Sequence, residues 1–272
     1  MTQSASGSNH RITFSQFRVT GVTLLLIAAA TIPIWLASAP ASFAQSEQRQ
    51  PVLVELFTSE GCSSCPPADA LLIELDKRQS VPGVEVVALG HHVDYWNGIG
   101  WHDRFSSHDA TVRQERYVSQ LNLQSPYTPE LVVDGHFDVV GNDRANVQRL
   151  VAAAAHSPKP ATVSLTAESP EALRVDVEGA PSPAADVMLA ITESDLSTAV
   201  GGGENGGREL HHTAVVRILQ RLGSTRDGRF YATTPIAYRP GWNRQHLRAV
   251  VFVQRGAGPV LGVGALALNP KS

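Results

Sequence analysis

The chain has 272 residues, of which 43% are hydrophobic and 17% are charged, and its formal net charge is −3. This composition supplies enough apolar side chains for a full core and excludes wholesale disorder. The sequence has no run or stripe of Lys and Arg, so a nucleic acid is not expected as a partner.

The first 44 residues have the pattern of a secretory signal peptide. Arg11 and Arg18 are the only charged residues in it, and an apolar stretch then leads to Ser42-Phe43-Ala44, a small-x-small cleavage pattern. We therefore expect cleavage near Ala44 and a secreted or periplasmic mature protein. An apolar stretch of about 20 residues can also span a bilayer, so a membrane anchor by an uncleaved leader is the alternative. Cleavage removes two of 22 basic residues and no acidic one, which leaves 20 against 25.

A strand, a helix and a second strand are predicted next. Val52–Phe57 is a nearly continuous apolar run, typical of a strand buried on both faces. From Pro66 the leucines fall at helical spacing, and prolines at 66 and 67 suit the first turn of a helix. Val84–Leu89 is the second apolar run. Because the joints are short, the three segments predict a right-handed parallel unit.

A polar and aromatic insertion is expected at about 91–127. Within it, the pattern predicts a helix over 109–121 with Val112, Val118 and Leu121 on its buried side.

The remaining segments predict a hairpin, a helix and a second domain. Residues 130–140 hold two short apolar runs joined at Asp134-Gly135, which favours a hairpin, and a helix follows to about His156. Residues 157–160 are a linker rich in proline. After the linker, repeated short runs with turn residues between them suggest a small β-sandwich, with a flexible loop at Gly201–Gly207.

Cys62 and Cys65 are the only cysteines of the chain. The loop that they enclose is too short for a disulfide to stabilise the fold much, so their value lies in chemistry. A helix that starts beside them favours a thiolate, which is the nucleophile of disulfide exchange. We expect Cys62 to attack and Cys65 to resolve the mixed disulfide. A structural disulfide and half of a metal site are the alternatives, and a zinc site would need two further ligands.

Histidines near the second strand raise a copper alternative. His91 and His92 end that strand, and with Cys62 and Cys65 one of them could form a Cu(I) site. We favour the reading in which these histidines are surface or capping residues. His211 and His212 are adjacent on a predicted strand, so they point to opposite faces and do not form a simple pair.

Four sequence blocks resemble one bacterial family. They are Val54–Asp69 with the sequence VELFTSEGCSSCPPAD, His92–Trp96, Tyr127–Pro129 and Gly203–Asn205. The chain is similar over nearly its whole mature length to predicted secreted, thioredoxin-like proteins of unknown function (domain of unknown function 1223).

The resemblance implies roles for several residues. Pro129 is expected to be the cis-proline that faces the thiols, and Thr128 before it offers its backbone to a bound peptide. Glu55 lies about where thioredoxins place a buried acid that relays protons, although here it is Glu in place of Asp and one residue further away. Two further residues are expected beside the substrate on other grounds. His92 ends a strand, where the active sites of open α/β sheets gather, and Trp96 is expected in an apolar wall around the thiols, with a place in the core as the alternative. The Ser63-Ser64 dipeptide leaves the direction of electron flow open.

These observations predict an α/β thioredoxin-like domain followed by a small all-β sandwich-like domain. The expected function is thiol–disulfide exchange on envelope or secreted proteins, with a redox partner protein, with no cofactor and with no metal. The alternatives are a copper-binding or metal-delivery module and a non-enzymatic adaptor. The expected segments are a signal peptide at 1–44, a short leader at 45–50, the thioredoxin-like domain at 51–156, the linker at 157–160 and the sandwich at 161–272.

Overall fold

The computed structural model describes residues 49–268, which all belong to one unit of the chain. The predicted signal peptide at 1–44 lies outside them, as does most of the predicted leader. None of the helices in 49–268 is both long and apolar enough to cross a membrane. The helices of this part are α1 (Pro66–Arg78), α2 (His108–Leu121) and α3 (Arg144–Ala155), with 3-10 turns η1 (Gly203–Asn205) and η2 (Arg244–His246). The strands are β1 (Gln50–Thr58), β2 (Val84–His92), β3 (Glu130–Val133), β4 (Phe137–Val140), β5 (Thr162–Ser169), β6 (Ala172–Glu178), β7 (Asp186–Glu193), β8 (Leu196–Ala199), β9 (Glu209–His212), β10 (Val215–Ser224), β11 (Phe230–Pro235), β12 (Leu247–Gln254) and β13 (Val260–Ala267).

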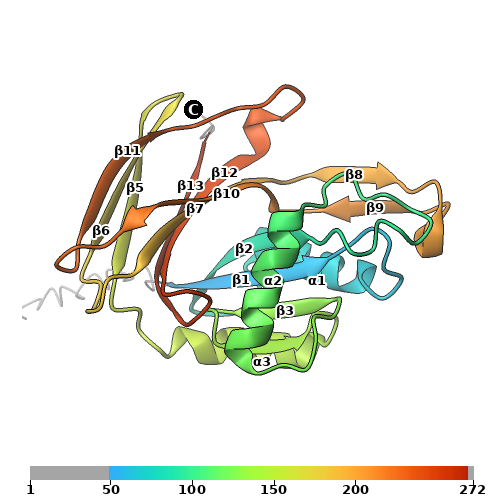
Figure 1. The fold of residues 1–272 in the computed structure, drawn as a ribbon, viewed down its shortest axis with the longest axis horizontal. Helices are drawn as coiled ribbons and strands as arrows, with labels where there is room; N and C mark the ends of the chain where they lie inside the picture. The colour runs from blue at the N-terminus through green and yellow to red at the C-terminus, as the bar shows by residue number, and fades with distance from the viewer. Residues whose placement is uncertain (1–48, 269–272) are drawn as a thin grey trace, which may run out of the picture. The chain divides into compact units, whose positions relative to one another are not determined.

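One mixed sheet of eight strands organises this unit (Figure 1). Its order is β13-β12-β7-β10-β2-β1-β3-β4, with β1 parallel to β2 and antiparallel to β3. A three-stranded sheet, β11-β6-β5, and a two-stranded sheet, β8-β9, complete the strands of the described residues.

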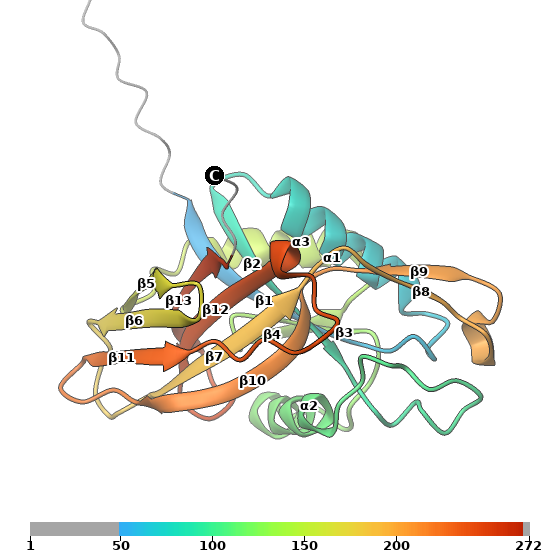
Figure 2. The ribbon, with the colours of Figure 1, turned by 90° about the horizontal axis from the view of Figure 1, so that it is seen from above.

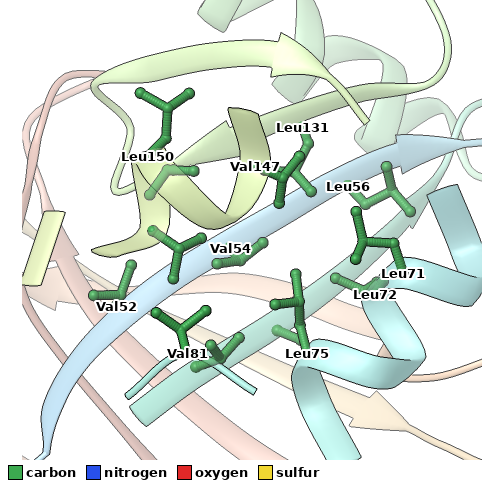
Figure 3. Packing of buried hydrophobic residues seen from close by; sticks show 14 of the residues in the cluster. Val52, Val54, Leu56, Leu71, Leu72, Leu75, Val81, Leu131, Val147 and Leu150 are labelled. Atoms are coloured by element: carbon green, nitrogen blue, oxygen red, sulfur yellow. The ribbon is translucent and has the colours of Figure 1, made fainter. Parts of the chain in front are cut away.

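The helices cover both faces of the β1–β4 part of the sheet. Figure 2 shows α1 and α3 on one face and α2 on the other. Val54 and Leu56 of β1 point to the first face, where they pack with leucines of α1 and with Val147 of α3 (Figure 3). Alternate side chains of a strand point to opposite faces, so Glu55 points toward α2. This alternation decides which buried groups lie together.

The predicted fold class is wrong. The chain is not an α/β thioredoxin-like domain followed by a separate sandwich, but a mostly β structure whose eight-stranded sheet takes strands from both sides of the 157–160 segment. The junction is β10, which pairs in parallel with the outer edge of β2 at Val215 and Gly90. An uncovered β2 edge would leave backbone groups unpaired, and β10 supplies a partner there. Leu53 and Leu89 correspondingly pack in one cluster with Phe252 of β12.

One loop has other surroundings than predicted, and one helix face needs correction. The segment around Gly201–Gly207, predicted as a flexible loop within the sandwich, connects β8 and β9, which form a two-stranded sheet of their own. The buried side of α2 is polar, with Arg113, Gln114 and Tyr117 inside, in place of the predicted Val112, Val118 and Leu121. The reason is that α2 covers a face of the sheet that carries buried carboxylates.

Candidate functional site

The two cysteines form a disulfide at the beginning of α1. β1 ends at Thr58, a short turn follows, and Cys65 is the residue that precedes the first helical residue, Pro66. The Cα atoms of Cys62 and Cys65 are 5.4 Å apart. The carbonyl oxygen of Cys65 accepts hydrogen bonds from the backbone of Ala68 and Asp69, so the helix starts directly at the motif. The predicted placement of the pair at a helix start is confirmed.

Both sulfur-bearing side chains are inaccessible to solvent. Cys62 and Cys65 are each 0% exposed, whereas Ser63 and Ser64 between them are exposed. The Ser64 hydroxyl lies 3.3 Å from the Sγ of Cys62. The motif therefore presents its two serines to the surroundings and keeps its sulfur atoms inside.

The end of the β8–β9 hairpin binds the main chain of the motif. We call residues 200–208 the Gly-rich loop. Within it, the buried side-chain amide of Asn205 donates to the carbonyl oxygens of Glu60 and Cys62, both at 2.9 Å. Glu204 accepts a hydrogen bond from the backbone N–H of Ser63 at 2.9 Å, and hydrogen bonding from the side chain and the backbone of Ser63 lowers the pKa of Glu204. These contacts link the loop to the motif across about 140 residues of sequence.

Glycine is required in this loop because Trp101 lies directly against it. A Cβ at Gly203 would come within 3.1 Å of the Trp101 Cβ, and the φ of Gly203 is +67°, which disfavours other residues. The Trp101 indole also donates to the carboxylate of Glu60 at 2.8 Å.

The segment that contains Pro129 lies beside the motif. The Thr128–Pro129 peptide bond is cis, as expected from the resemblance. The next turn connects it to the motif, because Gly141 donates to the Pro129 carbonyl at 2.9 Å and Asn142 donates to the Ser64 carbonyl at 3.4 Å.

Trp96 joins the same group of residues. Its indole donates to the Thr128 hydroxyl at 2.8 Å, and its Cβ would lie 3.3 Å from a Cβ at Gly61, the residue before Cys62. The structure thus brings together Cys62, Cys65, Thr128, Pro129 and Trp96, five of the residues predicted for the site.

Glu55 occupies a different environment from the one expected of a proton relay. Its carboxylate accepts hydrogen bonds from Arg113 at 2.7 Å and from Tyr117 at 2.5 Å. The Nε2 of His91 lies 2.9 Å from the same carboxylate. Burial opposes ionisation, but the Arg113 charge and the His91 contact outweigh it and hold the pKa of Glu55 well below its usual range. Glu55 is therefore an ionised partner of α2 on the sheet face opposite α1.

Asp69 is a buried acid that the sequence pattern did not identify. It lies four residues after Cys65 and so shares a face of α1 with it. Burial raises the pKa of Asp69 to about 7, with its hydrogen bond from the Thr58 hydroxyl opposing the shift. The signal for Asp69 in the sequence is its spacing from Cys65, which places both residues on one face of the helix.

His92 belongs to a buried cluster under the loop that begins the motif. Its Nδ1 lies 2.7 Å from the Oδ2 of Asp103. The same Oδ2 accepts a hydrogen bond from the backbone N–H of Glu60 at 2.9 Å. Burial disfavours the charged Asp103, but the His92 contacts outweigh this and lower the pKa of Asp103 to about 2. The ring centres of His212 and His92 are 4.8 Å apart, and the Nε2 of His212 lies 3.3 Å from the Oε1 of Glu60. His92 thus supports the main chain before Cys62, and direct contact with a substrate stays a prediction.

The copper alternative gains no geometric support in the described residues. Within 49–268, no group of three or more His, Cys, Asp or Glu residues is arranged to hold a metal ion. His91 and His92 each pair with a carboxylate, His91 with that of Glu55 and His92 with that of Asp103.

The chain is similar to a protein family and to a solved structure over most of its length. A family model described as a protein of unknown function (DUF1223) matches residues 53–254. A crystal structure of a protein from Agrobacterium tumefaciens is 26% identical, with a TM-score of 0.68, and the match covers 81% of this chain and 96% of that one. A β-glucosidase from Kluyveromyces marxianus in complex with glucose has a TM-score of 0.21 at 9% identity, over 57% of this chain and 17% of that one, which is too low to support any argument. Among curated proteins, none matches.

Proposed function

We propose that this chain, which belongs to the DUF1223 family of proteins of unknown function, exchanges its Cys62–Cys65 disulfide with thiols of other proteins. The observation that carries the proposal is the position of the disulfide at the first turn of α1, beside the segment that contains Pro129. A bridge across so short a loop adds little stability, and the described residues already contain extensive apolar clusters. A chemical role explains the pair better than a structural one.

The exchange has two steps. A thiolate of the partner protein attacks Cys62, a new disulfide forms between them, and the Cys62–Cys65 bond breaks with Cys65 leaving as a thiolate. A second partner thiolate then attacks the partner's own sulfur in the mixed disulfide, which releases the Cys62 thiolate. Two electrons pass from the partner to the cysteine pair, and the partner gains a disulfide. A disulfide-bearing redox partner restores the original state by the reverse sequence.

The start of α1 favours the charges that appear in these steps. Thiolates at a helix N-terminus are stabilised by the backbone N–H groups and the helix dipole. With its pKa of about 7, Asp69 exchanges a proton near neutral pH and lies one turn from Cys65. We assign it the proton transfer to and from the Cys65 sulfur, the role that the resemblance suggested for Glu55.

Access to the sulfur atoms requires the Gly-rich loop to move. In the closed arrangement Cys62 and Cys65 are both 0% exposed, so a partner protein reaches them only after Glu204 and Asn205 release the motif. The expected partners are proteins of the cell envelope or secreted proteins, in agreement with the signal peptide predicted at 1–44, and the chain itself is a secreted bacterial protein in this proposal. The chemistry rests on the site and not on the fold class first predicted.

The proposal is tested by trapping the mixed disulfide. Reduced Cys65→Ser protein, incubated with oxidised glutathione, is expected to form a stable glutathione adduct on Cys62, measured by mass spectrometry. The matched Cys62→Ser variant is expected to react at least about tenfold more slowly, because its remaining thiol lacks the attacking position. Equal rates in the two folded variants, or a Cys65→Ser rate no higher than that of the same chain in urea, would contradict the proposal.

A further inference from the structure

A cleft opens where β2 and β10 separate. The two strands pair at a single point, Val215 and Gly90. Beyond it, a cavity of about 580 Å³ is lined by the end of β2, by residues 216–220 of β10, by the start of α2 and by the segment around Trp242. This volume lies within the range of small-molecule sites.

Arg217 is placed in the cleft by an irregularity of its strand. The register between β10 and β7 shifts between Val216 and Ile218, so Arg217 is the extra residue of a β-bulge. Such bulges redirect a side chain out of the regular alternation. The guanidinium carbon of Arg217 lies 5.4 Å from the ring centres of both Phe105 and Trp242.

The guanidinium of Arg217 has N–H donors that no described residue accepts. Its nearest acid is Glu193, at 3.6 Å, and its side chain forms no hydrogen bond with another of the described residues. A guanidinium carries five N–H donors in a planar fork that fits a carboxylate or a phosphate.

Positive charge exceeds negative charge around Arg217. Burial lowers the pKa of Arg217, Glu193 opposes this, and the charges of Arg104 and Arg239 lower the pKa further. Asp109 is the acid in the cleft lining, and the first turn of α2 beside it adds backbone N–H groups that favour an anion. The charges around the cleft are thus those of three arginines (Arg104, Arg217 and Arg239) and two carboxylates (Asp109 and Glu193).

We propose that this cleft binds a small organic anion in which a carboxylate or phosphate group is attached to a planar apolar body. The anionic group binds to Arg217, with Arg104 and Arg239 supplying additional positive charge, and the planar body packs against Trp242 and Phe105. The site is separate from the disulfide and does not depend on the exchange chemistry proposed above.

The test is calorimetric titration of the purified protein at low ionic strength with four probes of known charge. Phenyl phosphate and benzoate are expected to bind saturably, and the tighter of the two identifies the anionic group. Benzylamine, which has a similar body and the opposite charge, is expected not to bind. Inorganic phosphate is expected to bind at least about tenfold more weakly than phenyl phosphate, because it lacks the planar body.

Variants distinguish the cleft from other basic surfaces. Arg217→Gln is expected to weaken binding of the preferred probe at least about tenfold, and Arg217→Lys is expected to recover only part of the loss, because lysine lacks the fork. Arg226→Gln, at an exposed arginine outside the cleft, is the matched control and should bind as the unaltered protein does. Absence of anion binding by the unaltered protein, equal binding of benzylamine, or unchanged affinity in a folded Arg217 variant would overturn the proposal.

Discussion

Asn205 holds the main chain on both sides of Gly61, and under the proposed function its release gives access to the two sulfur atoms. Its amide bonds to the carbonyl oxygens of Glu60 and Cys62 each contribute about 1 kcal/mol, a typical net value for such bonds. We expect Asn205→Ala to increase the rate at which dithiothreitol reduces the disulfide by roughly tenfold or more, since 1.4 kcal/mol corresponds to a factor of ten. The rate is measured by quenching with an alkylating reagent and counting the modified thiols.

The matched control for this prediction is Asn146→Ala, at an exposed position of α3. It should leave the rate of reduction unchanged. An Asn205→Ala protein that retains its fold and is reduced no faster than the unaltered protein would show that the Gly-rich loop does not limit access.

Asp69 makes the stability of the fold depend on pH. Burial raises its pKa from an ordinary value of 3.8 to about 7. At a pH between these two values, the folded state therefore holds a proton on Asp69 that the unfolded state has lost. The stabilisation from this group is complete below the unfolded pKa and is lost as the pH rises through the folded pKa, at roughly 1.4 kcal/mol per pH unit. Asp69→Asn is therefore expected to gain stability relative to the unaltered protein between pH 5 and pH 8, as measured by urea unfolding at each pH. A constant difference between the two proteins over this range would contradict the assignment.

At the scale of the element, α2 is held by an ion pair inside a polar face. Arg113 reaches across to Glu55 on β1, and both side chains are almost completely buried. Removing one member of such a pair leaves the other charge uncompensated, which typically costs about 3–5 kcal/mol. We expect this loss for Arg113→Met in urea unfolding. Arg116→Met, at an exposed position of the same helix, should change the free energy of unfolding by less than about 0.5 kcal/mol.

The sequence predicts the helices and strands well where a single residue pattern decides them. The prolines at 66 and 67 mark the start of α1, and the apolar runs of β1 and β2 are found at the expected places. The prediction of the buried face of α2 was wrong because polar residues are rarely buried unless partners neutralise them. The partners of the polar residues in α2 lie on strands that are distant in the sequence. The pairing of Arg113 with Glu55 depends on tertiary contacts that local periodicity does not reveal.

Within the site, proximity in sequence decided what could be predicted. The cysteine pair and the start of α1 are adjacent in the chain, so their arrangement follows from local rules. Asn205 lies more than 140 residues after Cys62, and its signal was a glycine-rich segment typical of any flexible loop. The buried position of His212 likewise follows from the β8–β9 hairpin, which was not predicted.

At the scale of the molecule, the parallel contact between β10 and β2 unites strands on both sides of residues 157–160. No local pattern specifies which strand covers a sheet edge, so the two halves were assigned to separate folds. Phe252 of β12 is completely buried in the same cluster as Leu53 of β1 and Leu89 of β2. The core of the described residues is therefore shared.

This shared core predicts cooperative unfolding. Phe252→Ala is expected to cost about 3–5 kcal/mol and to speed amide hydrogen exchange in β1 and β2 as well as in β12. Tyr231→Ala, at a side chain of β11 that is 62% exposed, is the control and should leave exchange in β1 unchanged. Faster exchange confined to β12 and its neighbours β7 and β13 would show that the two parts unfold independently.

The contacts of Asn205 have a consequence for how such a protein diversifies. Because this side chain binds main-chain oxygens, it places no demand on the identity of Ser63 and Ser64, the dipeptide that would set the redox potential of the proposed exchange. Glu204 of the same loop instead contacts Ser63 itself. Under the proposed function, a substitution at Asn205 would therefore change how fast partners gain entry, whereas a substitution at Ser63 would change both the redox potential and the contact that holds the loop.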